Sequence, residues 1–447
     1  MNQSTDQYVD ELVSWITARL HGDEVLLANY AGEEADFVRF NNGAVRQAGS
    51  VSQRSLELDL IASRRHGQFS VQLTGQAELD RDGLKHAVEE LRQQRESVSE
   101  DPYLLYNEAD VFSASVISRR LAELPAPEDA VGEIRRAAAG RDLVGIYAAG
   151  TTSIGFASSL GQRNWHEVST FGFDWSFYLR QDKAAKNSYA GQHWSDEAFA
   201  SKLDWSARQL EVLDRPPMDL RPGVFRAFLA PAAMVELTDM LSWGGFGLKS
   251  HRTKQTPLLR MLTEGASFSS TLRISEDTAG GLAPHFDSSG FTKPDEVVLI
   301  DQGRVADYLV SPRSAQEYGV PTNGASNWES PESIAVAPGR LASRDALAAL
   351  DTGLYIGNLW YLNFSDRAAC VTTGMTRFAT FWVQGGELVA PVNVMRFDDS
   401  LFHLLGDKLV DLTDTAELVL DASSYGARST ASARLPGALI EEMTFTL

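Results

Sequence analysis

Cysteine and closely spaced histidines, which build most protein zinc sites, are scarce in this sequence. Its 447 residues include one cysteine, Cys370, so neither an internal disulfide nor a cysteine-rich zinc cluster can form. The eight histidines are scattered, and the closest two, His66 and His86, stand 20 positions apart. A zinc motif on a helix needs two histidines within about one turn, and no such pair exists. A metal held by His251, His285 and Cys370 from separate loops remains the alternative.

Positive charge and long apolar runs are also scarce. Lysine and arginine total 40 against 60 aspartates and glutamates, which gives a formal net charge of −20. A field of this sign repels nucleic acid and anionic membranes, so neither is expected as a partner. No uninterrupted apolar run approaches the roughly 18 residues of a membrane span, and the N-terminal segment lacks the apolar core of a signal peptide. With hydrophobic residues at 43%, the composition predicts a folded cytoplasmic protein.

The motifs of several large enzyme classes are missing as well. Neither the Gly-x-Ser-x-Gly nucleophile elbow nor a phosphate-binding loop occurs. The triplet Asp351-Thr352-Gly353 matches aspartic proteases, but those enzymes need two such carboxylates and the triplet occurs once. We interpret it as a turn before a strand. Cys370 has no partner in a Cys-x-x-Cys motif, so we predict that it is a small buried residue.

The first half of the chain mixes helical and strand-like periodicity, which predicts a mixed α/β domain over residues 1–214. Apolar residues at helical spacing predict helices over 6–20, around 84–91, over 111–139 with a break near 124–127, and over 198–213. The segment Asn41-Asn42-Gly43 predicts a hairpin turn. Alternating apolar and polar residues predict an antiparallel sheet with one dry face, built from strands 25–29, 37–40, 45–50, 55–61, 69–73, 144–148 and 166–179.

A proline-rich segment, residues 215–223, predicts the linker between two domains. Its three prolines and one glycine prevent a regular element from forming there. Residues 224–447 are rich in strands and predict a β-rich, barrel-like second domain, so the whole chain is expected to be α+β. Helices are expected at 231–241 and 400–405, and hairpin turns at 301–303 and 384–386. The expected strands are 224–229, 271–274, 296–300, 304–310, 354–361, 379–383, 387–393 and 438–445.

One stretch of the second half, residues 374–382, combines an arginine with three aromatic residues. Arg377 leads into a strand that carries Phe378, Phe381 and Trp382. One interpretation makes Arg377 a structural residue that pairs with an aspartate. The other places it at the rim of a peptide groove, where its planar fork can hold a carboxylate or carbonyl oxygens.

Several segments together resemble the TldD/PmbA family, in which PmbA is also called TldE. No single motif is specific, but the ordered set is, and it extends over most of the chain. The segments are Arg39-Phe40-Asn41-Asn42-Gly43; Gly155-Phe156-Ala157-Ser158-Ser159-Leu160-Gly161; Phe286-Asp287-Ser288-Ser289-Gly290 with 300–309, 314–319 and 322–325; and Gly353-Leu354-Tyr355-Ile356 with 380–392 and 401–405.

The resemblance implies a cytoplasmic metallopeptidase subunit of bacterial or archaeal type, a family with the older label modulator of DNA gyrase. TldD-type chains carry a zinc-binding His-Glu-x3-His helix, and PmbA-type chains share the fold without it. The corresponding helix here, residues 231–241, contains Glu236 and Asp239 but no histidine. The chain therefore resembles the PmbA-type subunit, with no cofactor of its own and zinc expected in a TldD-type partner. It departs from the common PmbA pattern at residues 360–376.

The resemblance leads to a first hypothesis, a non-catalytic subunit that holds extended or unfolded peptides for a TldD-type zinc protease and forms a homodimer when alone. Its candidate peptide-binding residues are Arg377, Thr376, Asn323 and His251, and no residue is assigned a catalytic or metal-binding role. A second hypothesis is a free-standing hydrolase with a site around His251, Asp287 and Arg377. A third is a binding or scaffold protein without a proteolytic role.

Overall fold

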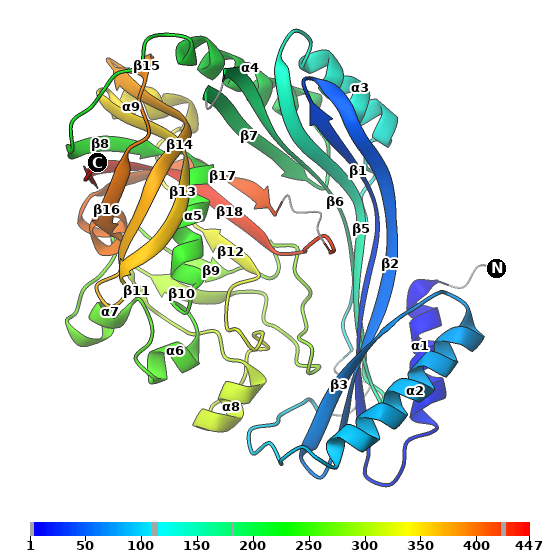
Figure 1. Cartoon of the computed structure of the whole chain (residues 1–447). Helices are drawn as coiled ribbons and strands as arrows, with labels where there is room; N and C mark the ends of the chain where they lie inside the picture. Colours follow the sequence, from blue (N-terminus) through cyan, green and yellow to red (C-terminus); the bar gives the residue numbers. More distant parts are fainter. Residues whose placement is uncertain (1–3, 109–114, 181–182, 422–425) are drawn as a thin grey trace.

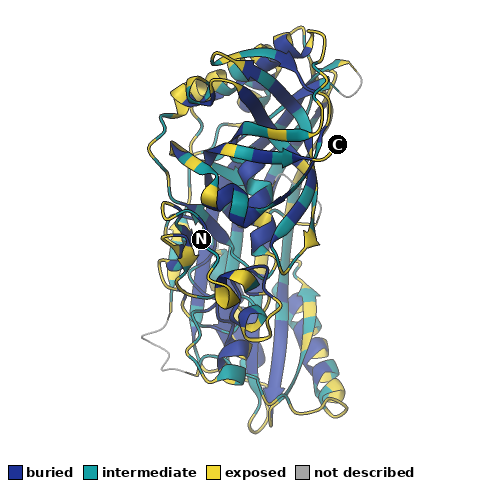
Figure 2. Ribbon diagram, turned by 90° about the vertical axis from the view of Figure 1, so that its left-hand side faces the viewer, coloured by how far each residue is buried: buried dark blue, intermediate teal, exposed yellow. Residues whose placement is uncertain are grey.

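Two β-sheets, one from each half of the chain, form the frame of the molecule (Figure 1). The computed structural model describes residues 4–108, 115–180, 183–421 and 426–447. Strands carry most of the buried side chains of the N-terminal half, whereas helices, loops and strands share those of the C-terminal half. Exposed residues gather on the outer faces of helices and in turns (Figure 2). The α+β fold expected from the sequence is confirmed. Across the described residues, no helix is both long and apolar enough to cross a bilayer.

The N-terminal sheet is predominantly antiparallel and has the strand order β3-β2-β1-β5-β6-β4, with β7 paired to β6. Helices α1 and α2 pack on one end of this sheet, while α4 packs on β6 and β7 at the other end (Figure 1). The elements are α1 (Thr5–Thr17), β1 (Val25–Asn41), β2 (Ala44–Ala62), β3 (Arg65–Gln72), α2 (Ala77–Arg95), β4 (Ile117–Arg120), α3 (Pro127–Ala137), β5 (Asp142–Ser158), β6 (Arg163–Arg180), β7 (Lys183–Gly191) and α4 (Asp196–Leu213).

Periodicity predicted the buried faces of this half correctly. The apolar stripes of α1 and α2 meet in one core, which includes Leu12 and Leu84, both fully buried. The alternating aromatic residues of β6 form a second core against α3 and α4, and Trp175 is fully buried there. The hairpin turn is confirmed, since Asn42 and Gly43 both have positive φ, 51° and 67°.

Two expectations for this half were wrong. The four short strands expected between residues 25 and 61 form two long ones, β1 and β2, which pair along almost their whole length. Their polar middle segments looked like loops because only part of each long strand faces a core. The helix expected over 111–139 is interrupted by β4, which pairs in parallel with β6, and α3 begins only at Pro127. Residues 111–114 of that expectation lie outside the described residues.

The C-terminal sheet closes on itself. Strand β8 pairs with β13 and also with β18, so β8, β13, β14, β16 and β18 form a ring, which confirms the barrel-like expectation. The strands are β8 (Gly223–Leu229), β9 (Ile274–Glu276), β10 (Val297–Asp301), β11 (Arg304–Val305), β12 (Ser333–Val336), β13 (Gly353–Asp366), β14 (Val371–Gln384), β15 (Glu387–Pro391), β16 (Arg396–Ser400), β17 (Leu409–Leu420) and β18 (Ser432–Phe445).

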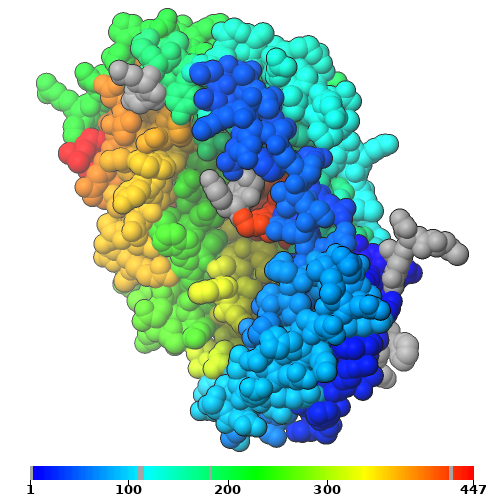
Figure 3. All heavy atoms as spheres, turned by 45° about the vertical axis from the view of Figure 1, so that its right-hand side comes forward, coloured from blue at the N-terminus to red at the C-terminus, as the bar shows by residue number. Residues whose placement is uncertain are grey.

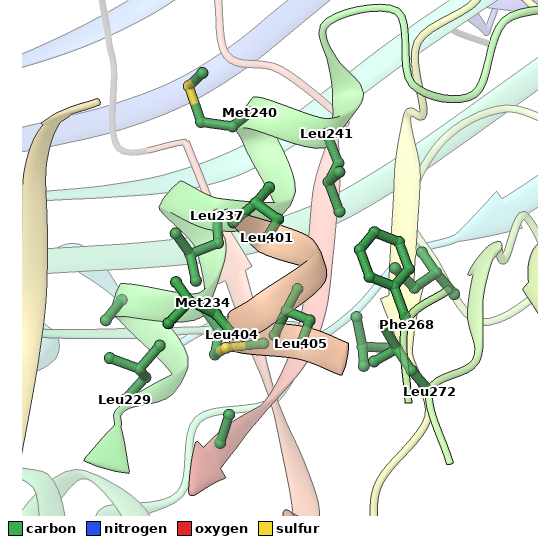
Figure 4. Packing of buried hydrophobic residues seen from close by; sticks show 14 of the residues in the cluster. Leu229, Met234, Leu237, Met240, Leu241, Phe268, Leu272, Leu401, Leu404 and Leu405 are labelled. Carbon is green, nitrogen blue, oxygen red and sulfur yellow. The ribbon is translucent and has the colours of Figure 1, made fainter. Parts of the chain in front are cut away.

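Helix α5 fills the interior of this half. Its apolar side contacts the segment that precedes β17 (Figure 4). The cluster includes Met234, Leu237, Met240 and Leu241 from α5 together with Leu401, Leu404 and Leu405. The helical elements are α5 (Pro231–Ser242), α6 (Leu248–Arg252), α7 (Leu259–Thr263), α8 (Pro312–Tyr318), α9 (Ala346–Leu350), the short 3-10 helix Ser343–Asp345 and a π-helical turn, His403–Asp407.

Details of the second half differ from the expectations. Strand β11 spans two residues rather than seven, and the segment 271–274 contributes only Ile274 to a strand. The helix expected at 400–405 is largely the π-helical turn. Strand β17 was not expected because its sequence lacks a sustained alternation, and it forms by pairing with β18. The turns at 301–303 and 384–386 are confirmed by positive φ at Gln302, Gly303, Gly385 and Gly386.

Two loops of the second half bind the N-terminal sheet. In the first, the backbone carbonyl of Ser288 accepts a hydrogen bond from Asn29 at 3.1 Å, and that of Gly290 accepts one from Gln162 at 2.7 Å. In the second, the guanidinium of Arg428 donates to the carbonyl oxygen of Thr170 at 3.0 Å. These contacts fix the two halves against each other.

Candidate functional site

Helix α5 occupies the position at which the family resemblance places a metal-binding motif. One side of the helix is buried in the core, and Glu236 and Asp239 lie on the other side, outside it. Burial raises the pKa of Glu236, and repulsion from Asp239 raises it further. Desolvation also raises the pKa of Asp239, with a contribution from Asp421. The Asp239 side chain is nevertheless solvent-exposed, so it faces open space beside α5.

The N-terminal sheet supplies the opposite wall of this space, which we call the hollow. Lys186 on β7 is close enough to Glu236 to lower its pKa. The ammonium group of Lys186 lies 3.3 Å from a carboxylate oxygen of Asp174 on β6. Burial raises the pKa of Asp174, although Lys186 opposes the shift. The space-filling view shows the molecule hollowed between the N-terminal strands and the C-terminal half (Figure 3).

The side chains around α5 do not fit a zinc ion. Zinc sites in proteins are built from thiolate, imidazole and carboxylate ligands in a tetrahedral set, and α5 offers two carboxylates without an imidazole. In the described part of the chain, no three His, Cys, Asp or Glu side chains are grouped to hold a metal.

The alternative metal site, built from His251, His285 and Cys370, does not fit a metal ion either. His251 is buried, and its Nε2 lies 2.6 Å from the carbonyl oxygen of Gly245. His285 instead neighbours Asp295, at 3.8 Å. Burial raises the pKa of the Cys370 thiol to about 12, so Cys370 stays protonated and does not act as a thiolate ligand. Its predicted burial is confirmed.

Arg377 and Thr376 lie on β14 and differ in role. Thr376 is fully buried, and its hydroxyl accepts the backbone N–H of Met395 at 3.0 Å, which is a structural contact. Arg377 is partly exposed, and its guanidinium lies 4.2 Å from the ring centre of Trp360 and 5.1 Å from that of Phe378. Within the described residues it has neither an ion pair nor a side-chain hydrogen bond. The aspartate partner of the structural interpretation is therefore not found in the described part of the chain.

Asn323 and His251 both contact Tyr308, far along the chain from β14. The side chain of Asn323 accepts the N–H of Val310 at 2.9 Å and donates to the carbonyl of Tyr308 at 2.8 Å. The ring of His251 packs 4.6 Å from that of Tyr308. Burial lowers the pKa of His251. Both side chains contact the loop that precedes α8. Asn323 is committed to protein partners, whereas Nδ1 of His251 is buried and has no hydrogen-bond partner among the described residues.

Asp287, the third member of the hydrolase hypothesis, lies in the loop that binds the N-terminal sheet. It accepts the N–H groups of Ser289 and Phe291 at 2.9 and 2.8 Å. Burial raises its pKa to about 6. Among the contacts of the described residues, no hydrogen bond or ion pair joins Asp287, His251 and Arg377.

Sequence reasoning missed Lys186, Asn358 and the unusual backbone of Phe378. Lys186 is an ordinary lysine in the sequence, and only the packing of β7 near β14 brings its ammonium group 5.9 Å from the Phe378 ring centre. Phe378 has φ of +56°, which no residue pattern announces in a strand. Asn358 stands opposite Arg377 in the β13–β14 register.

Comparisons with known proteins agree with this architecture. The family model described as the PmbA/TldA metallopeptidase C-terminal domain matches residues 222–447. TldE from Thermococcus kodakarensis has a TM-score of 0.77 at 14% identity, covering 98% of this chain and all of its own. A protein described as a modulator of DNA gyrase from Thermotoga maritima has a TM-score of 0.73 at 13% identity, covering 99% and 100%.

A second protein described as a DNA gyrase modulator, from Bacteroides thetaiotaomicron, has a TM-score of 0.75 at 16% identity, covering 98% of each chain. Sequence comparison with curated proteins gives no match. At these identities the solved structures show a shared fold. The family match extends over more than half of the chain and carries the stronger conclusion. The chain belongs to the PmbA/TldD family of metallopeptidase-like proteins.

Proposed function

We propose that this chain is a PmbA/TldE-like subunit that holds peptides, while a TldD-type chain supplies the zinc ion and the cleavage. The observation that carries the proposal is α5, which keeps its place beside the hollow but presents Glu236 and Asp239 without an imidazole. Both sheets and the interior helix are in place, and the fold is similar to that of TldE from Thermococcus kodakarensis over nearly the whole of both chains. A fold that keeps both sheets around a helix without metal ligands is consistent with a subunit that binds peptides and does not cleave them.

The shape of the hollow favours an extended or unfolded peptide. Burial raises the pKa values of Glu236 and Asp239, which lie on the side of α5 that faces the hollow. We propose that a single extended chain, rather than a folded domain, occupies this space. Strand β7, which carries Lys186, pairs with β6 alone among the described strands. Strand β7 also lies close to β14 and β17. We propose that a peptide adds to the part of the other β7 edge that these strands leave uncovered, the mode in which backbone hydrogen bonds give affinity. In line with the family resemblance, we place this work in the cytoplasm.

Reconstitution with a TldD-type chain tests the proposal. The two chains are purified separately and mixed, zinc is measured in each by elemental analysis, and cleavage of a labelled unfolded peptide is followed. We expect zinc in the TldD-type chain, and cleavage in the mixture that a chelator abolishes. About one zinc per chain in this subunit would overturn the proposal. Chelator-insensitive cleavage by this subunit alone would favour the free-standing hydrolase.

Assembly is a separate part of the proposal. We expect a homodimer of this chain in isolation and a heteromer after mixing, with an obligate interface of upwards of about 2,000 Å². Light scattering at micromolar concentration measures both states. A stable monomer of 49.0 kDa that also fails to associate with the TldD-type chain would contradict this expectation and favour a scaffold role.

A further inference from the structure

Arg377 is a cation with unused hydrogen-bonding capacity in an acidic protein. The chain carries 60 acidic against 40 basic residues, yet no carboxylate of the described residues pairs with Arg377. Its guanidinium is positioned instead by the Trp360 ring at 4.2 Å and the Phe378 ring at 5.1 Å. Aromatic contacts of this kind hold a guanidinium through its face and leave its N–H edge free for an acceptor.

The backbone beside Arg377 is distorted in a way that re-aims side chains. Phe378 adopts φ of +56°, a conformation that is costly for a bulky residue. The β13–β14 register shifts at this point, because Asn358 pairs with Arg377 while Ile356 pairs with Thr380. A bulge of this type turns a side chain away from the regular alternation of a strand. It brings the Phe378 ring near both Arg377 and Lys186, whose ammonium lies 5.9 Å from the ring centre.

Asn358 offers an unused acceptor next to the unused donor. Its Oδ1 atom is buried and has no hydrogen-bond partner among the described residues. A buried polar atom without a partner is costly, and either a water molecule or a ligand group can supply the missing donor. Asn358 and Arg377 are register partners on neighbouring strands. Because Oδ1 is buried in the free protein, a ligand held by Arg377 reaches it once the Asn358 side chain turns outward.

We propose that Arg377 and Asn358 bind the C-terminal residue of a peptide. The terminal carboxylate accepts hydrogen bonds from the Arg377 guanidinium, and the amide N–H of the same residue donates to Oδ1 of Asn358. Trp360, with 47% of its surface exposed, offers an apolar wall for the terminal side chain. This inference rests on the proposed peptide-holding role and adds that the subunit distinguishes one end of its substrate.

A series of labelled peptides tests the site without any variant. An unstructured ten-residue peptide is prepared with a free C-terminus, with a C-terminal amide, and with a C-terminal amide plus a glutamate as last residue. Binding to the purified full-length chain is followed by fluorescence anisotropy. We expect the free carboxylate to bind at least about tenfold more tightly than either amidated peptide. Equal affinities would overturn the proposal. Tight binding of the amidated glutamate peptide would also overturn it, because the site would then recognise an acidic side chain rather than the C-terminal carboxylate.

Variants then assign the contacts to residues. Arg377→Met is expected to reduce affinity for the free carboxylate to that of the amide, and to leave amide binding unchanged. The matched control is Arg344→Met, because Arg344 is highly exposed, and we expect it to retain the preference. Asn358→Ala should weaken binding of a peptide that ends in alanine but not of one that ends in proline, which lacks the N–H. A preserved preference in Arg377→Met would refute the assignment.

The outcome is separable from that of the proposed function. If the mixture with a TldD-type chain cleaves free and amidated peptides equally, the subunit role stands and the C-terminal site is wrong. If Arg377→Met lowers the melting temperature, Arg377→Lys replaces it as the test variant, because lysine keeps a positive charge at this position. A point charge lacks the planar fork, so this variant should bind the carboxylate peptide more weakly than the wild type. Full retention of affinity in Arg377→Lys would contradict recognition by the guanidinium fork.

Discussion

At the residue scale, Glu276 on β9 is a carboxylate that the fold has moved out of water. Its oxygens accept the backbone N–H groups of Glu332 and Ser333 at 2.9 and 3.0 Å. Burial raises its pKa to about 7, and these N–H groups and nearby Lys293 only partly offset the shift. Lys293 is itself buried and forms an ion pair with Glu332. The group therefore titrates near neutral pH within the folded protein.

The first prediction concerns the pH dependence of stability. Between 4.5, the ordinary pKa of glutamate, and about 7, folded Glu276 binds more protons than unfolded Glu276. The free energy of unfolding that this residue contributes therefore falls as pH rises through that window. We expect Glu276→Gln to gain stability relative to the wild type from pH 5 to pH 8, measured by urea denaturation at each pH. A constant difference would mean that the pKa of Glu276 is not raised.

Single residues were predictable from the sequence where local chemistry decides their role. Cys370 was expected to be buried because it has no partner motif, and Asp351 was expected in a turn, where it indeed has φ of +54°. The surroundings of Arg377 were not predictable. Its contacts with Trp360 and Phe378 depend on a strand register and a bulge, which arise from pairing between segments rather than from local pattern.

At the scale of elements, helix α5 has one side in the core and one side in the hollow, and the two sides should respond differently to substitution. Leu237→Ala removes a fully buried side chain, and we expect it to cost about 3–4 kcal/mol of unfolding free energy. Glu236→Gln relieves a desolvated carboxylate that Asp239 repels, so we expect no loss of stability at pH 7. Both are measured by urea denaturation. A large loss in Glu236→Gln would show that the carboxylate supports the fold and does not face the hollow.

The linker expected at residues 215–223 yields a further prediction. Most of its residues are exposed, although the N–H of Met218 donates to the carbonyl of Pro391 at 2.8 Å. Arg215 and Arg221 both precede proline, which blocks trypsin, so a protease of broad specificity is the right reagent. We expect the first cleavage of the native protein in this segment, located by mass spectrometry. Initial cleavage within residues 271–310 would contradict the boundary.

Elements were predictable where one face meets a core along their whole length. The stripes of α1, α2 and α4 and the alternation of β6 meet this condition. The long hairpin of β1 and β2 does not meet this condition. The middle of β1 lies between the two cores and the first half of β2 is largely exposed, so ladder hydrogen bonds hold these parts together. Strands β4 and β17 are held largely by pairing to β6 and β18, so their own sequences carry little signal.

At the scale of the whole molecule, Arg428 connects the two halves. Its guanidinium donates to Gly150 on β5 at 3.3 Å and to Thr170 on β6 at 3.0 Å, and its backbone N–H donates to Glu33 on β1 at 3.1 Å. Burial lowers the pKa of the Arg428 guanidinium. One side chain from the loop before β18 thus contacts the centre of the N-terminal sheet.

We expect Arg428→Met to weaken the coupling between the halves. The substitution keeps an apolar stem but leaves the carbonyls of Gly150 and Thr170 without their donor, at a cost of about 1–3 kcal/mol. Its control is Arg434→Met, since Arg434 is exposed and makes one long hydrogen bond of 3.4 Å; we expect that change to stay within about 0.5 kcal/mol. Differential scanning calorimetry should show a lower first transition for Arg428→Met. Equal transition temperatures for both variants would show that Arg428 does not couple the two halves.

The closure of the second sheet by β18 has a consequence for synthesis on the ribosome. Gly223 at the start of β8 pairs with Phe445 in β18, about 220 residues later in the chain. At roughly 5–20 residues per second, β8 waits on the order of ten seconds or more for this partner. β18 also pairs with β12, β16 and β17. The last strand of the N-terminal sheet ends at Gly191. During translation, the N-terminal sheet can therefore form while the strands of the C-terminal sheet are still unpaired, and these strands need protection from aggregation.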